Sequence, residues 1–223
     1  MSQIRITRET LLDGTLKRRR DSLATSCPDM GFRSEVEMEA LLEQTLAQHE
    51  SGQDLWLFGY GSLIWNPAFH YQEACCALVH GWHRSFCLKL FMGRGTPEKP
   101  GLMLALARGG ACRGVAFRIA AQEVRQELWL LWQREMFGGS YNAHWVQLKF
   151  GQQVVRGLTF VVNAASPRYT RGLSAEQTAR MILDAKGELG TNLEYFENTL
   201  AHLQTLGVKD STLMQIAAFL PSA

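Results

Sequence analysis

Residues 55–67 read LWLFGYGSLIWNP, and this stretch decides how the rest of the chain is interpreted. It begins with branched and aromatic apolar residues, which are typical of a buried strand. Two glycines spaced by one residue follow, and glycine lets the backbone leave a sheet sharply and expose its N–H groups. We therefore predict that Tyr60, Gly61, Ser62 and Leu63 form a loop that binds a negatively charged ligand oxygen. The alternative is a plain turn from strand to loop.

The composition is that of an ordinary soluble globular protein. The chain has 223 residues, which suffice for one good core, with 46% apolar and 20% charged residues. Its net charge of +2 is too small to indicate a nucleic-acid partner. The one basic run, residues 17–20, is predicted to be a solvated segment of a polar arm.

Cysteine usage and hydropathy indicate a reducing compartment. The chain has five cysteines and no C-x-x-C spacing, which argues against a disulfide framework and a zinc site. Residues 1–20 lack the apolar region of a secretory signal, and no apolar run approaches the ~18 residues of a membrane span. We expect a cytoplasmic protein without a membrane partner.

The order of elements predicts an α+β fold. Residues 1–33 form a polar arm that packs on the domain or frays, and residues 34–223 form a single domain. Ser34 and Glu37 make a capping box that opens a helix to about residue 50. Strands are predicted at 55–59, 72–80, 83–91, 102–108, 113–119, 143–149 and 153–163, and further helices at 121–136, 174–186, 191–206 and 211–219. Many short strands with flanking helices favour a small, closed or nearly closed barrel-like sheet.

Glu135 is the candidate catalytic residue. Val124, Leu128, Leu131 and Glu135 are spaced by four, three and four residues, so they share one face of a helix. A carboxylate on an apolar face is costly to ionise, and burial raises its pKa towards the range of a general base. Alternatively the stripe ends there and Glu135 is solvated or paired with an arginine.

Two arginines are candidate ligands for a carboxylate. Arg94 opens the loop RGTPEKPG at residues 94–101, which is either a pocket wall or a rigid connection between strands. Arg84 lies on a predicted strand and can face the pocket. His80 and His83 do not have the spacing of a metal site, and Cys75 and Cys76 are expected to be packed in the interior rather than nucleophilic.

Three segments, residues 58–65, 94–101 and 134–139, together resemble the ChaC family of γ-glutamylcyclotransferases. The likeness covers residues 54–206 and keeps the order of the motifs. It implies a barrel-like mixed sheet with flanking helices, and cleavage of glutathione into 5-oxoproline and cysteinylglycine. It also implies that Glu135 is catalytic.

The family pattern differs from this chain at two points. Its Asn-Pro-x-Tyr segment corresponds to residues 166–169, where Ser166 replaces Asn and Tyr169 either closes the pocket or only packs. Its Gly-Gly-Tyr segment is interrupted here by Ser140, so no role is carried over to Tyr141.

The implied reaction needs no water, metal or cofactor. The α-amine of a γ-glutamyl group attacks its own γ-carbonyl, and one carboxylate, Glu135, performs both proton transfers. The loop at 60–63 then holds either the α-carboxylate or the oxyanion. The rival interpretation is a module that binds phosphate or nucleotide. That loop, however, lacks the third glycine of a dinucleotide fingerprint and the Gly-Lys-Ser/Thr end of a P-loop. A carboxylate beside phosphate would also be repulsive.

Overall fold

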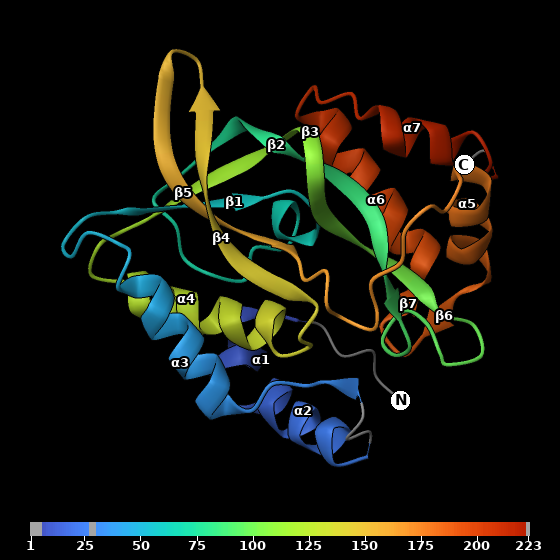
Figure 1. Ribbon diagram of the computed structural model, residues 1–223, viewed down its shortest axis with the longest axis horizontal. Helices are drawn as coiled ribbons and strands as arrows, with labels where there is room; N and C mark the ends of the chain where they lie inside the picture. The colour runs from blue at the N-terminus through green and yellow to red at the C-terminus, as the bar shows by residue number, and fades with distance from the viewer. Residues whose placement is uncertain (1–5, 27–29, 222–223) are drawn as a thin grey trace.

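Five strands close into a barrel in the computed structural model, which describes residues 6–26 and 30–221 (Figure 1). The strands are β1 Leu55–Gly59, β2 Glu73–Leu90, β3 Gly101–Ile119, β4 Tyr141–Phe150 and β5 Gln153–Val162. They follow the order β1-β3-β2-β4-β5, and a parallel pairing of β1 with β5 closes the barrel in an otherwise mostly antiparallel sheet. The predicted α+β class with a mixed, barrel-like sheet is confirmed.

The long strands β2 and β3 differ from the prediction of four shorter strands in this region. Each strand is continuous. At the point where the sequence suggested that the strand ends, a β-bulge bends the paired strands β2 and β3 without interrupting their pairing. Gly81, with a φ of 79°, lies opposite Gly109 and Gly110, which also have positive φ values. Glycines in a left-handed conformation allow a strand to bend without ending.

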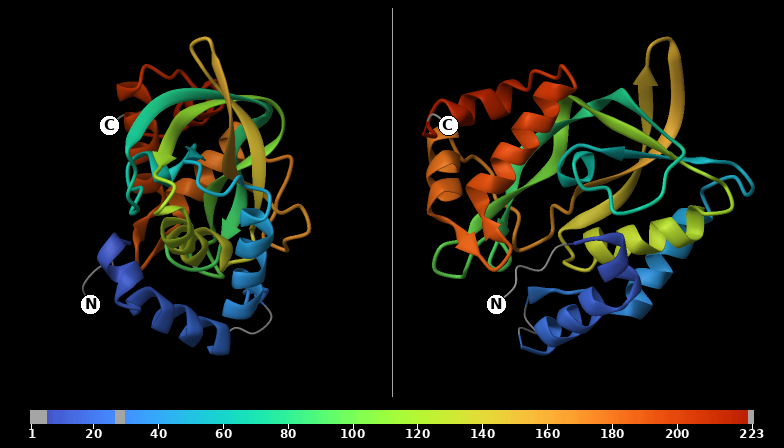
Figure 2. Two further views of the ribbon diagram at one scale, coloured as in Figure 1. Left: turned by 90° about the vertical axis from the view of Figure 1, so that its left-hand side faces the viewer. Right: turned by 180° about the vertical axis from the view of Figure 1, so that it is seen from behind.

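Helices cover the barrel on two sides (Figures 1 and 2). On one side lie α3 Glu35–Leu46, which is shorter than predicted, and α4 Val124–Leu131; on the other lie α5 Ala175–Asp184, α6 Asn192–Thr205 and α7 Ser211–Ala217. A two-stranded hairpin, β6 Lys186–Gly187 and β7 Gly190–Thr191, precedes α6. The capping boxes of Ser34 with Glu37 and of Ser174 with Gln177 are both present.

The polar arm contains two helices in its described part, α1 Arg8–Leu12 and α2 Thr15–Ser26; α1 packs against α4, and α2 lies beyond α1 at the outer end of the molecule (Figure 2). Residues 1–5 and 27–29 lie outside the described residues. The prediction that residues 17–20 are solvated is wrong for Arg20, which is only 6% exposed. Its guanidinium contacts the end of the helical segment that carries Glu135.

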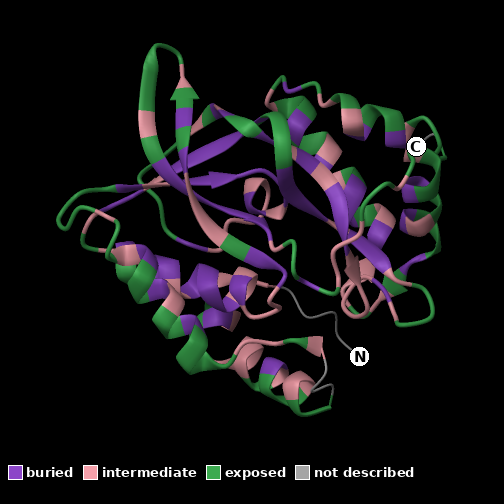
Figure 3. Ribbon diagram, in the orientation of Figure 1, coloured by how far each residue is buried: buried purple, intermediate pink, exposed green. Residues whose placement is uncertain are grey.

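Helix α4 packs its apolar stripe against the barrel, as Figure 3 shows by its buried residues. Val124, Leu128 and Leu131 are buried and join a cluster that includes Leu57 and Phe160 of the barrel strands. The predicted stripe is therefore confirmed, and it fixes the position of the segment that follows α4.

Cys75 and Cys76 are not both interior, contrary to our expectation. Cys75 is half-buried and Cys76 is exposed. Successive residues of a strand face opposite sides of the sheet, so two adjacent cysteines cannot share the core. As to membranes, the helices found within residues 6–26 and 30–221 all fall short of the length and hydrophobicity that a bilayer span requires.

Candidate active site

The helical segment that carries Glu135 widens at its end. Residues Trp132–Met136 continue α4 as a π-helical turn instead of completing the predicted α-helix to residue 136. Wide turns of this kind are frequent at functional sites. The side chain of Glu135 is 13% exposed. Burial raises the pKa of this carboxyl group, and the neighbouring Arg134 opposes that rise.

Arg134 connects Glu135 to the loop after β1. Its Nε lies 2.9 Å from Oε1 of Glu135, and its Nη2 donates to Oγ of Ser62 over 2.7 Å. Its Nη1 donates to the carbonyl of Asn66 over 2.5 Å. The structure thus brings together two regions that the sequence singled out, the 60–63 loop and Glu135, through an arginine to which we had assigned no role of its own.

The loop itself offers backbone donors. Ser62–Ile64 form one 3₁₀ turn (η2), and the first N–H groups of such a turn have no partner within it. Within the described part of the chain, no acceptor faces the N–H groups of Ser62 and Leu63. Gly61 leaves little room beside the loop, because a Cβ there would lie 3.3 Å from the hydroxyl of Tyr195.

Three buried tyrosines lie around Glu135. Tyr60 donates its hydroxyl to the carbonyl of Phe160 over 2.7 Å, and Tyr141 donates to that of Leu104 over 2.7 Å. Burial is the main reason that the pKa values of Tyr60, Tyr141 and Tyr195 are raised, and the charge of Glu135 adds to each rise. All three phenols are therefore protonated near neutral pH.

Tyr141 and Tyr195 are members of the site that the sequence reasoning missed. The inserted Ser140 led us to give Tyr141 no role, yet Tyr141 begins β4 and its side chain is buried beside the others. Tyr195 lies on α6, sixty residues from Glu135, and no local motif marks it.

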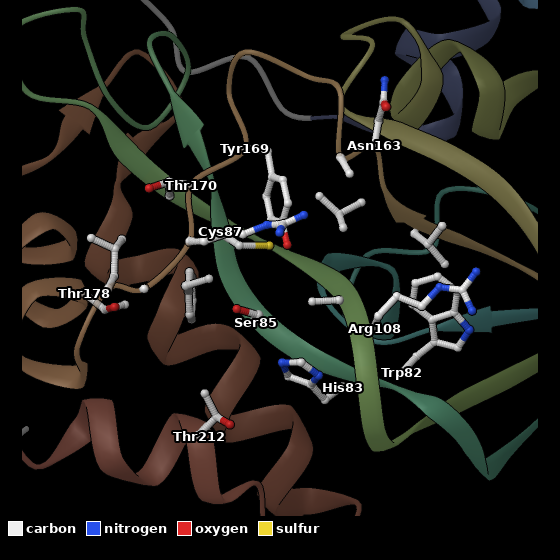
Figure 4. Close-up of a pocket in the computed structure, with 18 of the residues that line it drawn as sticks. Trp82, His83, Ser85, Cys87, Arg108, Asn163, Tyr169, Thr170, Thr178 and Thr212 are labelled. Carbon is white, nitrogen blue, oxygen red and sulfur yellow. The ribbon is translucent and has the colours of Figure 1, made fainter.

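A cavity of about 880 Å³ lies where β2 and β4 diverge (Figure 4), and its lining residues do not include Glu135 or the three tyrosines. The two strands pair at Leu78 and Lys149 and separate beyond that point. Cys87 and Tyr169 lie on the cavity wall, and the N–H of Thr170 donates to the carbonyl of Cys87 over 2.9 Å. Asn142 and Val162 line the cavity and adjoin Tyr141, because Asn142 follows it in β4 and Val162 is its partner in β5.

The cavity is basic. Arg108 lies over the ring of Trp82 at 4.4 Å and Arg171 over that of Tyr169 at 4.8 Å. His83 and His144 also face it, and among the described residues that line it none is Asp or Glu. Within the same described part, neither arginine has a carboxylate partner. An anionic ligand therefore suits this cavity.

The two arginines predicted to bind substrate are engaged elsewhere. Arg84, 2% exposed, donates to the carbonyls of Tyr60 and Arg113, each over 2.6 Å, and pairs with Asp210. It thus fixes the backbone at the start of the 60–63 loop.

Arg94 donates to the carbonyl of Thr191 over 2.7 Å and pairs with Glu194 at 2.9 Å. Neither Arg84 nor Arg94 is among the residues that line the cavity. A direct contact of either one with a ligand stays a prediction.

Comparisons with known proteins agree with this arrangement. A family model described as "ChaC-like protein" matches residues 55–222. The chain is 43% identical over 175 residues to a glutathione-specific γ-glutamylcyclotransferase of Escherichia coli, covering 78% of this chain and 76% of that protein. It is 32% identical over 160 residues to the human glutathione-specific γ-glutamylcyclotransferase 1, covering 70% and 72%.

The fold has a counterpart among solved structures. A crystal structure of a yeast γ-glutamyl cyclotransferase specific to glutathione superposes with a TM-score of 0.67 and 20% identity, over 75% of this chain and 97% of that one. At that identity the likeness concerns the fold alone. The family model, which matches most of the chain, and the relative at 43% identity show that this chain belongs to the ChaC-like family.

Proposed function

We propose that the protein is a γ-glutamylcyclotransferase that cleaves glutathione into 5-oxoproline and cysteinylglycine. The proposal rests on one observation above all: a buried carboxylate, Glu135, is held by Arg134 beside the free backbone donors of the loop at 60–63. A binding module for phosphate does not explain a buried carboxylate at that place. The names of the relatives support the same activity.

In the proposed reaction the substrate supplies its own nucleophile. Glu135 takes a proton from the α-ammonium, and the free amine attacks the γ-carbonyl to close a five-membered ring. The amide C–N bond then breaks as Glu135 returns the proton to the nitrogen of the departing cysteinylglycine. The ring nitrogen gives its remaining extra proton to the regenerated carboxylate, which passes it to the released amine, so the products are the neutral lactam and an ammonium. The N–H groups of Ser62 and Leu63 are placed to stabilise either the oxyanion or the α-carboxylate of the γ-glutamyl group.

The basic cavity fits the other end of the substrate. With the γ-glutamyl group beside Glu135, the cysteinylglycine portion extends towards Cys87 and Tyr169, and its glycine carboxylate comes near Arg171 or Arg108. A guanidinium without an internal carboxylate partner is suited to this role. Tyr169 forms part of the cavity wall beneath Arg171, and this position supports a role in closing the pocket.

The test compares two substrates with and without Arg171. We expect wild-type protein to release cysteinylglycine from glutathione and to act less efficiently on γ-glutamylcysteine, which lacks the glycine carboxylate. The variant Arg171→Ala should lose most of this preference, with the loss mainly in KM. Arg180→Ala is the matched control, because Arg180 is exposed on α5, where it pairs with Glu176 one turn before it. If wild type and Arg171→Ala preferred glutathione over γ-glutamylcysteine equally, Arg171 would not bind the substrate. If the wild-type protein did not cleave glutathione, the proposed function would be refuted.

The pH profile provides an independent prediction. Glu135 must be ionised to accept the ammonium proton, and burial raises its pKa above the ordinary value of 4.5. We therefore expect kcat/KM to fall as the pH drops through a pKa higher than 4.5. Steady-state rates measured over a range of pH values check this, and an acid limb at or below the ordinary value would contradict it.

The compartment proposed for this reaction is the cytoplasm. Glutathione is present there as the free thiol, and the described cysteines Cys75, Cys76, Cys87 and Cys112 are all free.

A further inference from the structure

The N-terminal arm, described over residues 6–26 and 30–33, contacts the turn that carries Glu135 through Arg20 and Arg33, in addition to a pairing of Arg8 with Glu127 of α4. The last carbonyl groups of a helix have no partner within the helix and need donors from elsewhere. At the end of the π-helical turn Arg20 and Arg33 of the arm donate to the carbonyls of Gln133 and Met136, and the carbonyl of Met136 also accepts from the N–H of Gly139 over 3.1 Å. Cations are favourable at this end of a helix, because the helix dipole is negative there.

Arg20 is buried in contact with this turn. Its Nη1 donates to the carbonyl of Gln133, and its Nη2 donates to Oε1 of the same residue over 3.0 Å. Its guanidinium lies 5.2 Å from the ring centre of Phe137. Burying a guanidinium is costly unless it is well paired, and burial lowers the pKa of Arg20 accordingly. A merely solvated basic run would not place this residue in the interior.

The segment at residues 30–33 contacts the same turn one step further on. Nη1 of Arg33 donates to the carbonyls of Met136 over 2.9 Å and of Tyr141 over 3.0 Å. Its backbone N–H donates to the carbonyl of Phe137 over 2.9 Å. Phe32 stacks on Phe137 with ring centres 4.6 Å apart.

Gly139 shows how closely the two segments approach. It has a φ of 66°, and a Cβ at this position would lie 2.5 Å from the carbonyl oxygen of Gly31. A side chain here would therefore have to displace the arm, so the glycine after the catalytic segment fits the arm as well as the turn.

We propose that the N-terminal arm is a positioning element for catalysis, with Arg20 and Arg33 as its positioning residues. The arm lies outside residues 55–222, which the family model matches. The inference rests on the proposed function only in that Glu135 is the proton-transfer group. By satisfying the carbonyls of Gln133 and Met136, the two arginines hold Arg134 and Glu135 in the geometry described above.

A specific kinetic consequence follows. Arg134 is the charge that opposes the rise in the pKa of Glu135, and it belongs to the turn that the arm holds. If the turn loosens, the contact between Arg134 and Glu135 is lost for part of the time, and the pKa of Glu135 rises further. Removing Arg20 or Arg33 should therefore reduce kcat and move the acid limb of the pH profile to higher pH.

The experiment uses the full chain with the variants Arg20→Ala, Arg33→Ala and Arg20→Lys. The control is Arg18→Ala, because Arg18 is exposed on the same helix and its hydrogen bonds within the described residues go to Asp13 and Thr15 of the arm itself. Two quantities are measured: the pH dependence of kcat and KM with glutathione, and amide hydrogen exchange of residues 132–139.

For the two alanine variants we expect kcat to fall by about 10- to 100-fold, as for a misplaced catalytic group, with little change in KM. Their acid limb should move to higher pH and exchange at 132–139 should become faster. Arg20→Lys should recover part of kcat, and Arg18→Ala should match wild type.

Wild-type kcat, pH profile and exchange in both alanine variants would overturn the proposal. The proposal would also be overturned if Arg20→Ala and Arg33→Ala lost no more kcat than the control variant Arg18→Ala. If an alanine variant fails to fold in a thermal unfolding measurement, Arg20→Lys and Arg33→Lys decide by the same two readouts. An inactive wild type would refute the proposed function instead, and hydrogen exchange would still report whether the arm holds the turn.

Discussion

Replacing Glu135 by Gln is expected to lower kcat by about 10²- to 10⁴-fold, the usual cost of removing a general base. Glutamine keeps the size of the side chain and can still accept a hydrogen bond from Arg134, but it cannot take the ammonium proton. Substrate binding should change little, because the loop at 60–63 and the basic cavity are untouched. Steady-state kinetics with glutathione measure both quantities. Retention of more than about a tenth of wild-type kcat would show that Glu135 is not the base.

A stability measurement separates lost chemistry from lost folding. Burial raises the pKa of Glu135 above its unfolded value. Its contribution to folding is thus fully present below the unfolded-state pKa and is lost as the pH rises through the folded-state pKa. At neutral pH the wild type bears the cost of an ionised buried carboxylate, whereas Glu135→Gln does not. The variant should therefore unfold at a temperature no lower than wild type. Glu176→Gln, at an exposed site on α5, should leave both kcat and the unfolding temperature unchanged.

Blocking the amine of the substrate should abolish turnover. N-acetylated glutathione keeps both carboxylates and the scissile amide, so contacts with the loop and with Arg171 can still form. It lacks the basic lone pair, so ring closure cannot begin. Positioned intramolecular attack has effective molarities on the order of 10⁵ M or more, which is why the reaction needs no activated water. We expect no cysteinylglycine from this compound and at most weak competition with glutathione.

The competition assay provides the control for this experiment. The acetyl group must fit where Glu135 meets the ammonium, so weak inhibition of glutathione cleavage would show that the compound reaches the site. Release of cysteinylglycine from N-acetylated glutathione would mean that water or a protein group is the nucleophile, and the cyclisation mechanism would be wrong.

The segment that carries Glu135 shows what periodicity predicts well. Val124, Leu128 and Leu131 are buried as their spacing indicates, and Glu135 lies one turn later, in the π-helical segment. The widening of the last turn could not be predicted. Over a single turn, the pattern of apolar residues is compatible with both an α-helix and a π-helix. Arg134 was missed for a related reason: its partners, Ser62 and Asn66, come from the loop after β1 and not from its own helix.

Long-range pairing explains most of the other differences. Arg84 and Arg94 were predicted as ligands because unpaired arginines suit carboxylates, but the sequence does not show that Asp210 and Glu194 lie beside them. Tyr195 has no motif around it and joins the site only because α6 packs along the barrel. The glycines at the bulge of β2 and β3 led us to predict separate strands, because a bulge and a turn both require glycine's backbone freedom.

The most direct test of the central claim is the identity of the product formed from the γ-glutamyl group. Glutathione labelled with ¹³C in that group is incubated with the protein, and the products are followed by NMR. We predict that the label appears as 5-oxoproline, in equal amount to the cysteinylglycine released, because the α-amine closes the ring before the amide bond breaks. Labelled glutamate as the main product would contradict intramolecular cyclisation and with it the proposed function.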